Sequence, residues 1–264
     1  QEGNSTAEFP HRPVAESGPG TLGKCATLRC WTDSTQRIVQ KITHLAWCMN
    51  FFQRLGVAFF RSPTYTNAVT AKFSKYATDF CVRSIKSGMW SGTTPYFHRI
   101  AKEMQEHGVL GPGTSVVDLG CGCGTFLHHL TRRQQNLSVS GIDLSGRAIK
   151  IAQRHFPRGR FVVGSMRNLS FLESETVDLV VSAGSISYLP ILEHLCDTLH
   201  EVVRVLKKPS GKGWLQRSGF NGCGPGVLRP PVDFVNQQCL GNTSWQLTKL
   251  DSKSDKCIYI LEHA

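Results

Sequence analysis

The sequence contains no run of 18 uncharged apolar residues, so no transmembrane helix is expected. It also has no initiator methionine, and we expect the chain to be processed or trimmed. Apolar residues make up 40% and charged residues 19%, a composition that predicts a globular protein. A chain of 264 residues can bury one good core, so one domain with an appendage is the expected organisation.

Acidic residues are few: 19 stand against 30 lysines and arginines, for a formal net charge of +11. The imbalance is concentrated between Asp33 and Lys102, where ten basic residues face two acidic ones. A basic surface of this kind can meet nucleic acid, an anionic membrane or an acidic substrate. A solvated basic face explains it equally well.

Ten cysteines would indicate disulfides in a small secreted domain, but this chain is too long to need them. Cys121 and Cys123 stand between glycines, where we expect a disulfide to distort the turn. Reduced thiols in the cytoplasm, or in an organelle matrix after removal of a targeting segment, are the predicted state. Cys121, Cys123, His128 and His129 do not have the usual zinc spacings, and no metal site is predicted.

The most informative stretch is TSVVDLGCGCGT, Thr114 to Thr125. Its β-branched run predicts a buried parallel strand over Ser115 to Leu119, and a helix pattern begins at Phe126. Gly120, Gly122 and Gly124 lie between the two and allow a sharp turn and close approach of a ligand. The unpaired N–H groups of the following helix favour a nucleotide-type ligand there.

A second acidic position strengthens this interpretation. Nineteen residues after Gly124, the predicted strand Leu137 to Ile142 ends in Asp143, followed by Leu144 and Ser145. A carboxylate at the tip of a second strand can accept hydrogen bonds from both hydroxyls of a ribose. The glycine spacing is GxGxG behind Asp118, and it differs from the GxGxxG of dinucleotide-binding proteins.

Together these residues resemble the class I S-adenosylmethionine-dependent methyltransferases, whose glycine motif reads much like VVDLGCGCG. The resemblance continues in FVVGSM, VDLVVSAGSISYL and EVVRVLKKPSGKG, in the family's order, and covers roughly Pro95 to the C-terminus. It implies S-adenosylmethionine as the methyl donor, and a donor site built from Asp118, Gly120, Cys121, Gly122, Gly124, Asp143, Leu144, Ser165, Met166 and Ser182.

The resemblance also implies individual roles. The glycine turn would approach the methionine moiety, and Asp143 would bind the ribose. Ser165 and Met166 would flank the adenine, and Ser182 would lie near the reaction centre. Many relatives have an acidic residue where Ser165 stands, and a hydroxyl is a weaker acceptor for the adenine amino group.

The expected fold is α/β: a doubly wound, Rossmann-like, seven-stranded sheet with an antiparallel C-terminal hairpin and an N-terminal helical cap. The further strands are predicted at 161–163, 177–181, 214–217, 245–250 and 257–263, and helices follow Ser145 and Pro190. The expected domains are a disordered leader (1–33), a helical cap or lid (34–97) and the methyltransferase domain (98–264).

Within the cap, helices are predicted over 34–60 and 67–87, and a further helix over 96–105 leads into the first strand. Residues 38–60 are apolar enough to pack on the core, to cover a substrate or to touch a membrane surface. Gly88-Met89-Trp90 looks similar to an element that helps cover the donor in some small-molecule methyltransferases.

Methyl transfer from a sulfonium needs little acid–base help, because holding donor and acceptor in line supplies much of the catalysis. Candidate groups on the acceptor side are Tyr188 and Trp90, and the further titratable residues are His98, His128, His129 and His194. Ser182-Ala183-Gly184-Ser185 replaces the Asn-Pro-Pro-Tyr type of motif used by amino-methylating nucleic-acid enzymes, which favours a small-molecule acceptor. An RNA or protein methyltransferase using the basic N-terminal region, and a non-catalytic scaffold that binds the donor, remain alternatives.

Overall fold

The computed structural model describes residues 71–72, 75, 81, 94–217, 231–250 and 257–264. The leader 1–33, the predicted helix 34–60 and Trp90 lie outside these residues. Ala71, Lys72, Lys75 and Cys81 are helical and fall within the helix predicted over 67–87. No helix in the described residues is both long and apolar enough to span a membrane.

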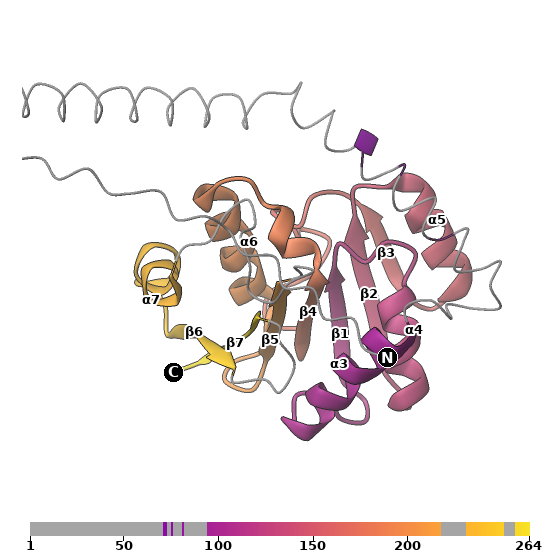
Figure 1. The fold of residues 1–264 in the computed structure, drawn as a ribbon, viewed down its shortest axis with the longest axis horizontal. Helices are drawn as coiled ribbons and strands as arrows, with labels where there is room; N and C mark the ends of the chain where they lie inside the picture. Colours follow the sequence, from indigo (N-terminus) through magenta and orange to yellow (C-terminus); the bar gives the residue numbers. More distant parts are fainter. Residues whose placement is uncertain (1–70, 73–74, 76–80, 82–93, 218–230, 251–256) are drawn as a thin grey trace, which may run out of the picture. The chain divides into compact units, whose positions relative to one another are not determined.

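Seven strands form one sheet in the order β3-β2-β1-β4-β5-β7-β6 (Figure 1). They are β1 (Ser115–Leu119), β2 (Ser138–Asp143), β3 (Arg160–Val163), β4 (Leu179–Gly184), β5 (Lys212–Arg217), β6 (Trp245–Leu250) and β7 (Cys257–His263). The first five pair in parallel, and β7 pairs antiparallel with both β5 and β6. The predicted doubly wound sheet with its antiparallel C-terminal pair is therefore confirmed.

Helices cover both faces of the sheet (Figure 1). The helices are α3 (Thr94–Glu106), α4 (Thr125–Arg133), α5 (Gly146–His155), α6 (Leu192–Val205) and α7 (Val232–Val235), with the short helices η1 (Ser185–Tyr188) and η2 (Asn236–Leu240). Side chains of α3, α4 and α5 pack on one face, and those of α6 and η2 pack on the other. The short helices η1, α7 and η2 were not predicted, because they are too short to show a periodic pattern.

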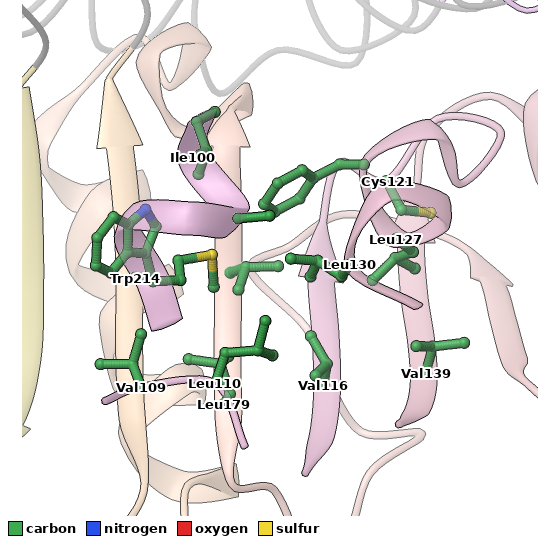
Figure 2. Packing of buried hydrophobic residues seen from close by; sticks show 14 of the residues in the cluster. Ile100, Val109, Leu110, Val116, Cys121, Leu127, Leu130, Val139, Leu179 and Trp214 are labelled. Atoms are coloured by element: carbon green, nitrogen blue, oxygen red, sulfur yellow. The ribbon is translucent and has the colours of Figure 1, made fainter. Parts of the chain in front are cut away.

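The two cores follow the alternation of side chains along each strand. Val116 and Trp214 belong to the core under α3, whereas Val117 and Leu215 belong to the core under α6. Figure 2 shows the first core, to which Ile100 of α3 and Trp214 of β5 both belong. Because these strands are buried on both faces, they appear in the sequence as continuous apolar runs.

The fourth strand begins two residues later than predicted. The main-chain N–H of Val177 donates to Val205 at the end of α6, and Val177 forms only an isolated bridge with Leu206. The Asp178 carboxylate then accepts hydrogen bonds from the main-chain N–H of Ser115 at 2.9 Å and from Lys207 Nζ at 2.8 Å. These contacts fix the amino end of the sheet, opposite to the end that carries the glycine turn.

The prediction that the cysteines are reduced is wrong for several of them. Disulfides join Cys81 to Cys123 and Cys196 to Cys239, and Cys257 is disulfide-bonded as well. Cys123 can pair without distorting the turn because its side chain packs away from it, in a small cluster with Cys81 and Ala148 of α5. Cys121 is the one free cysteine among the described residues, so the expectation of a thiol holds at that position.

Candidate active site

The glycine turn joins β1 to α4 and is held against the carboxyl end of β2. The main-chain N–H groups of Gly120 and Cys121 both donate to the Ile142 carbonyl, at 2.8 and 3.1 Å. Gly120, Gly122 and Gly124 have φ angles of 71, 54 and 82°, a region that residues with a β-carbon rarely adopt. The turn therefore requires glycine at all three positions for conformational reasons alone.

The space around the three glycines differs. A β-carbon at Gly120 would lie 2.4 Å from Ser185 Cβ, and one at Gly124 would lie 2.8 Å from the ring of Phe156. A β-carbon at Gly122 would meet nothing within 4 Å. The outer glycines are thus packed against the protein, whereas the middle one borders open space that a ligand can enter.

Asp143 is the acidic residue at the tip of β2, and the structure brings it to the turn. Its Oδ2 accepts the main-chain N–H of Gly122 at 2.9 Å, and its Oδ1 accepts that of Ser145 at 2.8 Å. Burial raises the pKa of Asp143 above its ordinary value, and the two main-chain hydrogen bonds act in the opposite direction. The same residue therefore fixes the middle of the turn and the start of α5, where Ser145 caps the helix as predicted.

Asp118 and Cys121 lie behind the turn. Asp118 is 2% exposed, and burial, with the charge of Asp143 as a second cause, raises its pKa well above the ordinary value. Burial also raises the pKa of the Cys121 thiol, which packs against Gly141 of β2. The structure therefore assigns Cys121 a packing position between β1 and β2. Leu144, half-buried, follows Asp143 at the start of the link to α5.

Ser165 and Met166 follow β3, on the same edge of the sheet. The Ser165 side chain is exposed, and its hydroxyl accepts the main-chain N–H of Arg167 at 3.3 Å. The Met166 methyl group lies 3.7 Å from the position of a β-carbon on Gly120. Met166 is thus brought to the turn, while Ser165 stands at the solvent side.

A charged pair on α6 holds the segment after Met166. Glu201 Oε2 accepts the main-chain N–H of Leu169 at 2.6 Å, and Arg204 Nη2 donates to the Leu169 carbonyl at 3.0 Å. The hydrogen bond from Arg204 lowers the pKa of Glu201, which favours the charged carboxylate that accepts the Leu169 main-chain N–H. This pair was not identified from the sequence, because it acts on a segment more than 30 residues away.

Ser182 is fully buried, and its hydroxyl is engaged within the protein. Ser182 Oγ accepts the main-chain N–H of Ile186 at 3.1 Å and lies 2.8 Å from Ser185 Oγ. Ser185 in turn donates to the Leu119 carbonyl at the end of β1. The sequence analysis named Ser185 only as part of the Ser182-Ala183-Gly184-Ser185 segment and assigned it no contact with β1; the small residues Ala183 and Gly184 are the one local signal of a close approach.

Of the acceptor-side candidates, Tyr188 ends η1, just past the carboxyl end of β4, and is 53% exposed. The histidines do not converge on the turn as a set. His128 Nδ1 lies 3.2 Å from His155 Nε2, His98 Nε2 lies 3.2 Å from Arg133, and His194 is buried in α6. Burial, with His155, His129 and Arg132 nearby, lowers the pKa of His128 to about 4.

Comparison with known proteins agrees with this geometry. Residues 116–211 match the family described as "Methyltransferase domain". Over 117 residues the chain is 35% identical to a phthiotriol/phenolphthiotriol dimycocerosates methyltransferase of Mycobacterium ulcerans, which covers 44% of this chain and 40% of the relative. Over 69 residues it is 32% identical to the demethylmenaquinone methyltransferase of Thermotoga maritima, covering 26% of this chain and 30% of the relative. The chain thus spans less than half the length of these relatives.

Among solved structures, the chain resembles a TehB-like S-adenosylmethionine-dependent methyltransferase from Corynebacterium glutamicum. The TM-score is 0.54 at 21% identity, over 74% of this chain and 99% of the other. This likeness concerns the fold, whereas the match over residues 116–211 concerns the domain itself. Residues 116–211 therefore match a methyltransferase domain, and the described residues have the fold of an S-adenosylmethionine-dependent methyltransferase, as the glycine motif predicted.

Proposed function

We propose that this chain transfers the methyl group of S-adenosylmethionine to a small-molecule acceptor. The observation that carries the proposal is the arrangement of Asp143 and Gly122: a buried carboxylate and a main-chain turn that borders open space. The sequence relatives named above support a small-molecule acceptor, since their names specify phthiotriol or phenolphthiotriol dimycocerosates and demethylmenaquinone.

The residues present fit this donor. A carboxylate offers about four lone-pair sites, and two main-chain N–H groups occupy two of those on Asp143. The remaining two match the two hydroxyls of a ribose. Gly122 leaves room for the part of the ligand nearest the turn, and Met166 offers an apolar surface beside Gly120.

When bound, the donor supplies an electrophilic methyl group on a sulfonium, and the electron pair of the breaking C–S bond stays on sulfur. The chain's contribution is to bind and orient both molecules, which is worth roughly 7–11 kcal/mol of the barrier when the alignment is good. Asp143 and the turn fix the donor side. Tyr188 and Trp90 are the proposed contacts on the acceptor side.

An untargeted metabolite screen with a methyl-labelled donor tests the proposal. We expect the label in a small, organic-extractable product, and calorimetry should show binding of both S-adenosylmethionine and its demethylated product. Transfer of the label to RNA, lost when the reaction is run at raised salt, would instead indicate a nucleic-acid methyltransferase. Donor binding with no transfer to any acceptor would indicate a scaffold, and binding of NADH in place of the methyl donor would refute the donor assignment.

A further inference from the structure

Gln216 is a fully buried side chain whose hydrogen-bonding groups are not used. It lies on β5 with an exposed fraction of 0%, and neither its Oε1 nor its Nε2 has a hydrogen-bond partner. Buried amides are almost always paired, because removing them from water without compensation is costly. An amide kept at such a position requires an explanation that the packing of the sheet does not give.

The position of Gln216 relates it to the donor side. Gln216 is the penultimate residue of β5, paired with Ala183 of β4 and Ile258 of β7. The donor residues occupy the carboxyl ends of β1, β2 and β3, and ligands of such sheets lie beyond these ends, where the strand order reverses. An acceptor in line with the donor must therefore lie toward the carboxyl ends of β4 and β5.

The same face of the sheet carries Asp118 on β1. Alternation places Asp118 with Val116, and Gln216 with Trp214, in the core under α3. Asp118 is level with Val181 of β4, which is level with Trp214. Gln216 thus stands two strands from Asp118, about 10 Å sideways, and two residues nearer the carboxyl edge.

Trp214 adds a second unused donor on this strand. Its Nε1 is also buried without a partner. In Figure 2 this nitrogen lies on the side of the indole ring that faces the strand arrowheads. Gln216 lies two residues farther along β5 in that direction. The neighbouring strand residues Val181 and Ile258 are apolar, and the ring centroid of His107 lies 6.1 Å from that of Trp214. Trp214 and Gln216 therefore place two neutral polar groups on the α3 face of β5, among mostly apolar buried side chains.

We propose that Gln216 is an acceptor-recognition residue, and that its amide binds a neutral oxygen, a hydroxyl or carbonyl, on an otherwise apolar acceptor. This inference rests on the proposed methyltransferase function and goes further by naming the acceptor class. An amide can donate and accept at once, which suits a hydroxyl or carbonyl. A carboxylate or an ammonium ion would lose its hydration here and gain no opposite charge from Gln216 or Trp214.

The test replaces Gln216 by methionine, which has nearly the same shape and no amide. Because the buried amide has no hydrogen-bond partner in the protein, Gln216→Met in the full chain should raise the melting temperature by about 2–4 °C. The dissociation constant of S-adenosylmethionine should stay within about twofold, since the donor residues are untouched. The matched control is Gln246→Met, at an exposed glutamine of β6, which should change neither quantity.

The acceptor class is measured with three probes of nine carbons each, namely 1-nonanol, nonanoic acid and nonylamine, on protein saturated with the demethylated donor. Wild-type protein should bind the alcohol about tenfold more tightly than the acid or the amine, and Gln216→Met should lose most of that preference. An unchanged preference in the variant, no binding of the alcohol by wild type, or unfolding of Gln216→Met would each overturn the inference. Loss of donor binding by wild type would instead refute the methyltransferase proposal itself.

Discussion

The carboxylate of Asp143 accepts the main-chain N–H of Gly122 at 2.9 Å, so the tip of β2 is bonded to the middle of the glycine turn. Asp143 therefore has two roles, one structural and one in ligand binding, which the sequence alone does not distinguish. It shapes the turn through Gly122, and it keeps lone pairs free for a ligand.

Replacing Asp143 should weaken donor binding. In Asp143→Ala the ribose hydroxyls lose a charged acceptor and the turn loses its bond, so we expect a loss of about tenfold to a hundredfold, or roughly 1.5–3 kcal/mol. Calorimetry with S-adenosylmethionine measures it. Asp178→Asn is the matched control, because Asp178 pairs with Ser115 and Lys207 at the opposite end of the sheet and should leave the dissociation constant unchanged. Equal affinity of wild type and Asp143→Ala would contradict the assignment.

The open space beside Gly122 can be tested with a single methyl group. Gly122→Ala should cost about 1–2 kcal/mol of stability from its left-handed backbone, and lower donor affinity at least tenfold because the methyl group enters the ligand's space. Gly108→Ala is a control for the strain: its φ is 64°, it also has nothing within 4 Å, and it follows α3 away from the turn. If both variants bind the donor equally well, the ligand does not approach Gly122.

The Cys81–Cys123 and Cys196–Cys239 disulfides form a natural pair for comparison. They close loops with sequence separations of 42 and 43 residues, so each should contribute about 4 kcal/mol on the chain-entropy estimate. Only Cys123 belongs to the glycine turn. We therefore expect Cys81→Ala and Cys196→Ala to lose similar stability in denaturant unfolding, while Cys81→Ala alone loses about fivefold in donor affinity as the turn gains freedom.

Peptide mapping without reductant should first verify the Cys81–Cys123 linkage. Treatment of wild type with dithiothreitol should reproduce the loss of donor affinity, and Cys81→Ala should be insensitive to it. An equal effect of Cys196→Ala on donor affinity would show that the first disulfide acts only through global stability.

His128 should make stability depend on pH between about 6.5 and about 4. Its folded pKa of about 4 lies below the ordinary 6.5, so the folded chain stays neutral at His128 while the unfolded chain takes up a proton. The free energy of unfolding therefore falls as pH decreases through this window, and His128 has no further effect below it. Urea unfolding of wild type and His128→Gln across this range checks it: the variant should show a shallower slope, and parallel slopes would contradict the expectation.

The sequence by itself determined the elements and the turn, because these depend on local patterns. Apolar runs marked the parallel strands, and Ser145 marked the start of α5. The glycine spacing and Asp143 indicated the ligand edge, and the hairpin of β6 and β7 lies at the predicted residues.

What only the tertiary structure decided are the contacts between residues far apart in the chain. Ser185 lies against Gly120, and Cys123 pairs with Cys81, neither of which any local pattern encodes. The Ser182 hydroxyl on β4 accepts the main-chain N–H of Ile186 in η1, and the side-chain amide of Gln216 has no partner on the α3 face. Strand periodicity fixes which face a side chain takes, but only the packed sheet determines which partners are there to meet it.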